Sequence, residues 1–294
     1  MLKDNSITTQ LLFGTVRIIA KDAQGNPSYG TGFFFNFKVD EERQVPVIIT
    51  NNHVVSGAVS GTFFVHQASE DLQVPSEKSY PINVSDFEQR FIKHPNQEID
   101  LCAMPIGSLI EQAASQKLNI FNRCMDESLI PTQSQLEDLR AMEDIVMVGY
   151  PVGLWDEVNN FPLLRRGITS SHPGTDFAGK SIGVVDIAAF PGSSGSPICI
   201  VNEGSYSTPN GTFFGGSRFL LLGILYAGPQ FTANGEVQIV EVPTVQKAIA
   251  NTMIPAHLGF YIKAKEIIKL KEHLFSVLNI KADGDNQAST TLVK

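Results

Sequence analysis

Short apolar runs separated by turn residues recur along most of the chain. The runs are rich in Val, Ile and Phe and about four to eight residues long, which is typical of β-strands. The predicted strands cover residues 33–35, 45–50, 61–66, 99–106, 145–149, 183–188, 197–201, 219–226 and 237–242. Many short strands with Gly and Pro between them favour an all-β sandwich or barrel.

Two stretches have a helical pattern instead. Residues 108–118 predict a short helix in the middle of the chain. Residues 263–279 predict a longer, amphipathic helix that docks on the β-rich body, with an apolar face made of Ile267, Leu270, Leu274 and Leu278. Its lysines between 263 and 271 are expected on the solvated face, the alternative being a patch for membrane or nucleic acid. The polar tail, 281–294, is expected to be frayed.

Composition narrows the class of protein. The chain has 294 residues, of which 43% are hydrophobic and 18% charged, as in an ordinary globular protein. The net charge is −8 and no cluster of Lys and Arg is present, so we expect no nucleic-acid partner. No run of 18 apolar residues is present, so we expect no membrane span.

The cysteines and the opening of the chain indicate a compartment. Cys102, Cys124 and Cys199 have no CxxC spacing, so neither a disulfide framework nor a zinc site is predicted. Cys102 and Cys199 lie in apolar runs and are expected to be reduced core residues. The first residues lack the apolar stretch of a secretory signal. We therefore expect a cytoplasmic protein, or one whose signal has been removed.

The strongest chemical signal is the turn at residues 191–197, PGSSGSP. Its glycines permit backbone angles that other residues resist. The turn can then aim the amides of Gly192 and Ser194 into one small space, which stabilises negative charge in a transition state. Ser194 places its hydroxyl beside that space and is the candidate nucleophile. The alternative is a polar loop between two strands.

A serine hydroxyl needs a base, which is usually a histidine. His53 is the candidate because it follows the apolar run 47–49 and a polar turn, at the end of a strand. A lone histidine is more often structural, but the contexts of the other five are weaker. They are His66, His94, His172, His257 and His273.

The third member must be a buried carboxylate that orients the histidine. Asp100 opens the apolar run 101–106, and an acid beside such a run is costly to bury unless it is paired. A strand-capping Asp is the alternative. The order His53, Asp100, Ser194 is one of those in which this triad occurs.

These segments resemble the trypsin-like (chymotrypsin-fold) serine peptidases, especially the bacterial HtrA-like branch without a PDZ domain. The similar segments are 30–33 (GTGF), 50–55 (TNNHVV), 98–103 (EIDLCA), 148–153 (VGYPVG), 186–197 (DIAAFPGSSGSP), 222–224 (LGI) and 258–262 (LGFYI). The resemblance implies an all-β fold of two six-stranded antiparallel barrels with the site between them. One barrel, 1–120, would carry His53 and Asp100, and the other, 121–262, would carry Ser194. Residues 263–294 would add the C-terminal helix and a flexible tail.

The resemblance also assigns roles. His53 would be the general base, Asp100 its orienting partner, Ser194 the nucleophile, and the amides of Gly192 and Ser194 the oxyanion hole. The substrate would be a polypeptide, and no metal or cofactor is implied. The mechanism would be acyl transfer to Ser194 followed by hydrolysis.

The specificity residues follow from the same motif. Ala188 and Ala189 would lie at the base of the primary pocket, so cleavage after small or medium apolar residues is expected. The segment Tyr226, Ala227 and Gly228 would pair with the substrate backbone as an added strand.

One position departs from the family. Ser193 stands where trypsin-like zymogens have an Asp that captures a freed N-terminal amine, and the chain does not begin with Ile-Val-Gly-Gly. We therefore expect control by loop ordering or by a regulatory protein partner rather than by trimming. Two other functions stay open, a silent pseudoprotease that binds peptides and a β-rich interaction protein that is not a peptidase.

Overall fold

The computed structural model describes residues 6–70, 74–228, 230–237, 248–255 and 257–281. The first part of the chain forms a nine-stranded sheet. Its strands are β1 (Thr15–Lys21), β2 (Pro27–Lys38), β3 (Gln44–Thr50), β4 (Ser60–Ala68), β5 (Pro75–Ser85), β6 (Ile92–Lys93), β7 (Cys102–Pro105), β8 (Ile120–Phe121) and β9 (Met125–Asp126). Their order is β5-β4-β1-β2-β3-β7-β6, with β8 paired to β4 and β9 paired to β2.

The second part closes into a six-stranded barrel in the order β10-β11-β12-β19-β16-β13. Its strands are β10 (Asp144–Gly149), β11 (Leu163–Thr169), β12 (Ile182–Asp186), β13 (Pro197–Asn202), β16 (Arg218–Ala227) and β19 (Leu258–Lys263). All the pairings are antiparallel. The β-rich class and the barrel are thus confirmed, whereas the domain limits at residues 120 and 262 stay predictions.

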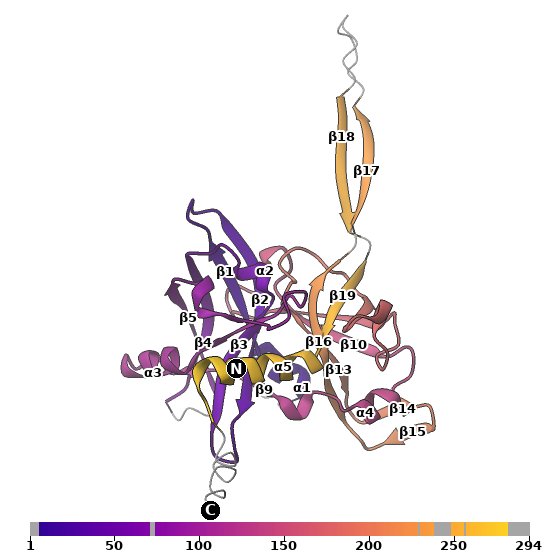
Figure 1. Cartoon of the computed structure of the whole chain (residues 1–294), viewed down its shortest axis with the longest axis horizontal. Helices are drawn as coiled ribbons and strands as arrows, with labels where there is room; N and C mark the ends of the chain where they lie inside the picture. The colour runs from indigo at the N-terminus through magenta and orange to yellow at the C-terminus, as the bar shows by residue number, and fades with distance from the viewer. Residues whose placement is uncertain (1–5, 71–73, 229, 238–247, 256, 282–294) are drawn as a thin grey trace, which may run out of the picture.

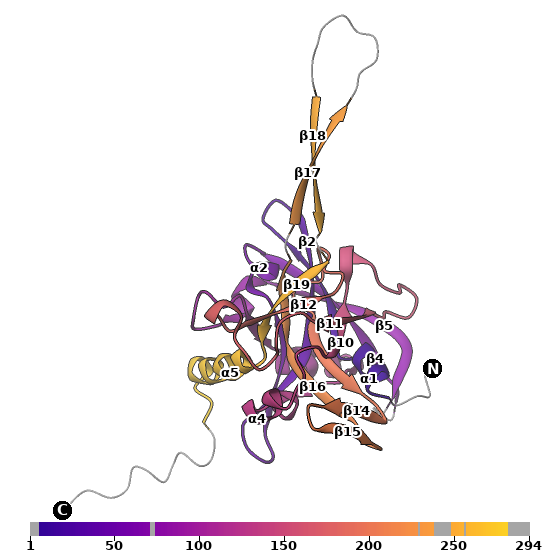
Figure 2. The same ribbon diagram turned by 90° about the vertical axis from the view of Figure 1, so that its right-hand side faces the viewer.

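Two hairpins extend from this barrel. One joins β14 (Ser205–Thr208) to β15 (Gly211–Phe214), and the other joins β17 (Gln230–Val237) to β18 (Ala248–Pro255). The second hairpin leaves the barrel between β16 and β19 and projects far from the body (Figures 1 and 2). The strand predicted over 237–242 reaches this hairpin at Val237, and residues 238–242 lie outside the described residues.

Helices are short except at the end of the chain. They are α1 (Ile7–Leu12), α2 (Asn52–Val55), α3 (Gly107–Ser115), α4 (Gln133–Glu137) and α5 (Lys265–Leu278), with 3₁₀ turns η1 (Glu88–Arg90), η2 (Glu127–Leu129), η3 (Pro151–Gly153) and η4 (Phe177–Gly179). The helix predicted over 108–118 is α3 and the one over 263–279 is α5. No described helix is long and apolar enough to cross a membrane.

The strand predicted over 99–106 is shorter than expected. Only Cys102–Pro105 forms β7. Residues before it make a tight turn, in which the amide of Leu101 donates to the carbonyl of Ile99 at 2.8 Å. This turn frees Asp100 from the sheet, so its carboxylate can reach another segment.

One apolar core spans both sheets. Phe33, Phe35 and Ile49 of the first sheet share a buried cluster with Val148, Leu221 and Ile262 of the barrel. Ile267, Leu270 and Leu274 of α5 belong to the same cluster and are fully buried. Helix α5 lies across the two sheets (Figure 1), and it therefore helps to fix their relative position.

The polar side of α5 differs in part from expectation. Lys265 and Lys269 are exposed on the helix, as expected for a solvated face. Lys263 instead belongs to β19, is only 5% exposed and pairs with Asp176 at 3.0 Å. Leu278 was expected on the apolar face but is 42% exposed, because it lies in the last turn before Asn279 ends the helix.

We predict that Leu270→Ala lowers the free energy of unfolding by about 2–5 kcal/mol, because it leaves a cavity in the core that joins the sheets. Val277→Ala on the same helix removes a half-exposed apolar side chain and should change the stability by less than about 1 kcal/mol. Urea unfolding of both variants measures the difference. Equal decreases in the free energy of unfolding of the two variants would show that α5 does not pack tightly on this core.

Candidate active site

His53 and Asp100 form a direct pair. His53 lies in α2, directly after β3, and Val54 and Val55 anchor that helix in the core. The Nδ1 atom of His53 lies 2.5 Å from Oδ2 of Asp100, and the amide of His53 donates to Oδ1 at 2.9 Å. The buried Asn51 side chain donates to the Asp100 carbonyl at 2.8 Å. Both oxygens of one carboxylate therefore hold the histidine, which fixes the orientation of its ring.

Ser194 follows a tight turn between β12 and β13. The amide of Ser193 donates to the carbonyl of Phe190 at 2.9 Å, which closes the turn. Pro191 and Gly192 occupy its two central positions, and Gly192 has a φ of +86°. Pro followed by a residue of positive φ is the pattern of a type II turn, which requires Gly at this place. The turn thus explains why the sequence has Pro191 and Gly192 before the serines.

The amides of this segment divide into two groups. Those of Ser193, Gly195 and Ser196 each donate to a backbone carbonyl. Within the described residues, those of Gly192 and Ser194 donate to no protein acceptor. Two free N–H groups two residues apart, flanked by bonded ones, form a pair of donors that can bind an oxyanion.

Thr31 of β2 ties this turn to the first sheet. Its amide donates to the Ser194 carbonyl at 2.9 Å, and its carbonyl accepts from the Thr50 hydroxyl at 2.7 Å. Its hydroxyl donates to the Gly192 carbonyl at 3.0 Å and accepts from the Tyr150 amide at 3.1 Å. Thr50 ends β3 just before His53. Through Thr31, the segment that carries Ser194 therefore lies against the segment that carries His53.

Close contact at this junction leaves room only for glycine. A Cβ atom on Gly195 would lie 1.9 Å from the Thr31 carbonyl oxygen, and its φ is +86°. Any other residue at 195 would separate the two segments. Among the described residues, Ser194 Oγ makes no hydrogen bond to His53, so the structure brings the two residues to one junction without a direct bond between them.

The residues expected to recognise substrate lie beside the turn. Ala188 and Ala189 are partly buried, and Tyr226 is partly buried at the end of β16, followed by the exposed Ala227 and Gly228. A Cβ atom on Gly228 would lie 3.6 Å from the Ala189 Cβ. The structure thus places Ala189 against the edge that Gly228 forms.

Arg165 is a residue that the sequence reasoning missed. It lies in β11, a strand that the apolar pattern did not predict, and its Nη1 donates to the Ala188 carbonyl at 2.6 Å and to Ser193 Oγ at 3.0 Å. The signal was a pair of arginines, Arg165 and Arg166, between apolar and glycine residues. Only the fold shows which of the two points inward.

Residues 148–153 were among the similar segments, but sequence reasoning missed the contacts that η3 and the loop after it make. The amide of Val152 donates to the Pro191 carbonyl at 2.5 Å, next to Gly192. Trp155 in this loop stacks on the guanidinium of Arg17, 3.5 Å from the ring centroid. Burial lowers the pKa of Arg17, and the ring contact supplies a favourable partner for that charge. Thus η3 is bonded to the turn, and the loop after it packs on the first sheet.

The comparison with known families agrees with this geometry. A family model described as a trypsin-like peptidase domain matches residues 30–205, more than half of the chain. The chain belongs to this family. It is a peptidase of the trypsin-like class, as the resemblance in its sequence implied. No curated protein sequence matches the chain.

Several solved structures are similar to this trypsin-like peptidase. The Rv3671c protease from M. tuberculosis in its active form is 14% identical, with 92% of this chain and 84% of that chain covered and a TM-score of 0.45. The HtrA-type protease AlgW with tripeptide is 15% identical, with 92% and 62% covered and a TM-score of 0.48. The inactivated protease paralogue S-I1 from the scabies mite is 11% identical, with 92% and 97% covered and a TM-score of 0.42.

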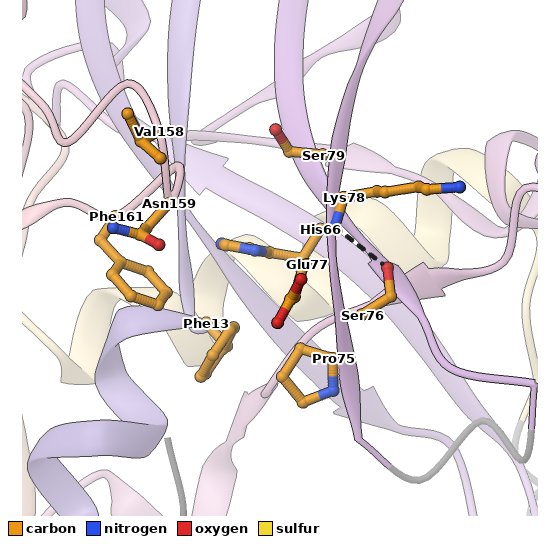
Figure 3. Close-up of a pocket in the computed structure, with 10 residues that line it drawn as sticks. All are labelled: Phe13, His66, Pro75, Ser76, Glu77, Lys78, Ser79, Val158, Asn159 and Phe161. Carbon is orange, nitrogen blue, oxygen red and sulfur yellow. Dashed lines mark hydrogen bonds between the residues drawn. The ribbon is translucent and has the colours of Figure 1, made fainter. Parts of the chain in front are cut away.

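The trypsin-like peptidase also has a cavity of about 430 Å³, whose lining does not include His53, Asp100 or Ser194. It lies between β4, the start of β5 and the loop at residues 158–161, and the rings of Phe13, His66 and Phe161 gather on one side of it (Figure 3). His66 packs against Phe13 and Phe161 at ring-centroid distances of 4.8 and 5.5 Å. Burial lowers the pKa of His66 to about 4. Its imidazole is therefore neutral at neutral pH and acts as part of the apolar wall.

We predict that His66 makes the stability depend on pH. The folded chain protonates His66 only near pH 4, whereas the unfolded chain does so near 6.5. This contribution to stability is present above pH 6.5 and is lost as the pH falls toward 4. Between pH 7 and 5 the free energy of unfolding should fall by about 2 kcal/mol.

Urea unfolding at both pH values measures this loss, and His66→Gln should remove most of it. Other groups contribute the same pH dependence to both proteins, so the comparison isolates His66. A variant with the pH dependence of the wild type would contradict the prediction.

Proposed function

We propose that the chain is a serine endopeptidase that acts through an acyl-enzyme on Ser194, with His53 as base, Asp100 as its orienting partner and the Gly192 and Ser194 amides as oxyanion hole. The observation that carries the proposal is the pair of free amides at Gly192 and Ser194, among bonded neighbours. They lie in a turn that Thr31 ties to the strand before His53. Nucleophile, base and oxyanion donors are thus supplied by two sheets and meet at one junction.

The His53–Asp100 pair sets the direction of proton transfer. An ionised carboxylate only accepts hydrogen bonds, so Nδ1 of His53 carries the proton that faces Asp100. The other ring nitrogen, Nε2, is then unprotonated and can take the proton of the Ser194 hydroxyl. Asp100 stays ionised and stabilises the imidazolium that forms.

Acylation follows from these positions. Ser194 Oγ attacks the carbonyl carbon of the substrate while His53 takes its proton, and the carbonyl oxygen becomes an oxyanion. The amides of Gly192 and Ser194 donate to that oxygen as its charge develops, and one such donor contributes on the order of 10²–10³ in rate. His53 then gives its proton to the leaving amine, the C–N bond breaks, and the acyl group stays on Ser194.

Deacylation repeats the sequence with water as nucleophile. His53 takes a proton from water, the hydroxyl attacks the ester carbon, and the same amides stabilise the second oxyanion. His53 returns the proton to Ser194 Oγ as the acid product leaves. No redox partner or added group is needed for the atoms to balance.

A second candidate is a catalytically silent pseudoprotease that binds peptides. The observation that favours it is that Ser194 Oγ makes no hydrogen bond to His53 among the described residues. Such bonds are often long in the absence of substrate and tighten on binding, which is why the active enzyme is preferred. The exposed edge at Ala227 and Gly228 would bind peptide in both cases.

We predict that a fluorophosphonate probe labels the wild type and that Ser194→Ala abolishes the labelling. His53→Ala should lower the labelling rate by at least about 10³-fold, because the hydroxyl loses its base. The measurement is the second-order rate of labelling, with circular dichroism to show that each variant is folded. His273→Ala, on α5 and away from the junction, is the matched control.

Two results would decide between the candidates. Labelling lost in both variants and kept in the control supports the peptidase. A folded wild type that the probe does not label, but that binds peptide, would establish the pseudoprotease.

We further propose cleavage after small or medium apolar residues. The supporting contacts are those of Ala189, which packs on the barrel core and would touch side chains placed at Gly228 or Gly259 at 3.6–3.7 Å. Neither Ala188 nor Ala189 carries a charge that would attract Lys or Arg. The position and the size of these two alanines favour a narrow pocket to which they add no charge.

We predict that a peptide library shows Ala, Val or Leu before the cleaved bond. Gly228→Val should narrow the pocket and reduce cleavage after Leu relative to Ala by about 10-fold or more, in line with 1–3 kcal/mol per methylene. Mass spectrometry of the products measures both. Cleavage after Lys or Arg would overturn this account of the pocket.

We also propose a cellular compartment and a mode of regulation for this chain. The three cysteines are free and two of them are buried, which supports a reducing, cytoplasmic compartment. Ser193 bonds to Arg165 and carries no acid for a freed amine, which supports control by loop ordering or a protein partner. A trimmed and active N-terminus in purified protein would contradict the second.

A further inference from the structure

The segment before Ser194 is held by one side chain from the barrel wall. Arg165 Nη1 donates to the Ala188 carbonyl at 2.6 Å and to Ser193 Oγ at 3.0 Å. Nη1 has two hydrogens, so these two bonds use both. Ala188 begins the segment and Ser193 ends it, directly before Ser194. One guanidinium nitrogen thus spans the turn that carries Gly192.

The amide, carbonyl and hydroxyl of Ser193 are all hydrogen-bonded. It is fully buried, its amide donates to the Phe190 carbonyl, and its carbonyl accepts from the Ser196 amide at 3.0 Å. Both of these bonds are internal to the turn. Within the part of the chain that the structure describes, the bond from Arg165 to its hydroxyl is the hydrogen bond that ties Ser193 to another element. Thr31 and Val152 bind the carbonyls of Gly192 and Pro191.

The position of Arg165 is unfavourable for stability. Its Nε and Nη2 atoms are buried, and no hydrogen-bond partner for them exists among the described residues. No described carboxylate forms an ion pair with it, whereas its neighbour Arg166 pairs with Asp144 at 3.0 Å on the surface. Burial lowers the pKa of Arg165 to about 10. A buried charge without a counter-ion destabilises a fold, so packing alone does not account for it.

We propose that Arg165 is a positioning residue, which holds the turn at residues 188–193 so that the amides of Gly192 and Ser194 keep their aim at the oxyanion. This inference rests on the proposed function. Among the described residues, Arg165 makes no hydrogen bond to Ser194 or His53. It acts through Ser193 and Ala188, and its removal therefore lowers the rate of the chemical step rather than the binding of substrate.

The test uses two substitutions at one place. Arg165→Met keeps the length and the apolar stem but removes the donors, whereas Arg165→Lys keeps a charged donor that can reach one of the two oxygens. Arg166→Met is the matched control, because Arg166 is the next residue of β11 and is exposed. The measurements are kcat and KM on a peptide substrate, the fluorophosphonate labelling rate and the midpoint of thermal unfolding, Tm.

We predict that Arg165→Met lowers kcat and the labelling rate by on the order of 100-fold, as a small misplacement of reacting groups does, with little change in KM. Its Tm should stay the same or rise, because an unpaired buried charge has been removed. Arg165→Lys should recover part of the rate. Arg166→Met should match the wild type in all three measurements.

Other results would overturn the inference. If Arg165→Met labels at the wild-type rate, the turn does not need Arg165. If its activity falls only as far as its Tm and folded fraction fall, Arg165 has a merely structural role. Failure of the proposed function looks different, since the folded wild type itself would then not be labelled.

Discussion

The geometry of the candidate active site depends on the four hydrogen bonds of Thr31. The amide, carbonyl and hydroxyl of this buried residue together bind three segments, those of Gly192 and Ser194, of Tyr150 and of Thr50. Loss of any one bond would leave a buried polar group without a partner, which costs about 1–3 kcal/mol. The two sheets therefore cannot shift against each other at this point without a large loss of free energy. His53 and Ser194 come from different parts of the fold, so this constraint keeps their segments in one place.

The apolar core shared by the two sheets also helps to hold the segments of His53 and Ser194 together. Phe33 and Phe35 follow Thr31 at alternate positions of β2, and they share a core with Val148 and Ile262 of the barrel. Helix α5 covers that core with Leu270 and its neighbours. The hydrophobic contacts set the approach of the sheets to within a few ångströms, and the directional bonds of Thr31 then select one arrangement. Arg165 contributes a third constraint, at the expense of a buried charge.

Most strands and the candidate residues could be predicted from local sequence. The roles of Thr31 and Arg165 could not, because they depend on partners that are distant along the chain. Short apolar runs indicate strands because each run fills one buried face, and His53, Asp100 and Ser194 stand in motifs whose neighbours constrain their backbone. Thr31 stands in such a motif too, but its partners Gly192 and Tyr150 are 161 and 119 residues away. The strand that carries Arg165 has neighbouring rather than alternating apolar residues, so the period of two that marks a strand is absent. Roles that depend on distant partners become visible only in the fold.

The hairpin of β17 and β18 has a consequence for how this molecule can change. It leaves the barrel just after Ala227 and returns just before Leu258, and β16 and β19 pair directly at its base, Ala227 opposite Phe260. The barrel is thus closed below the insertion, and doubling the length of such an excursion adds only about 0.6 kcal/mol of closure entropy. The length of this arm is therefore nearly uncoupled from the free energy that closes the barrel. The barrel is complete without it, so the arm is an addition to the architecture rather than a part of its support.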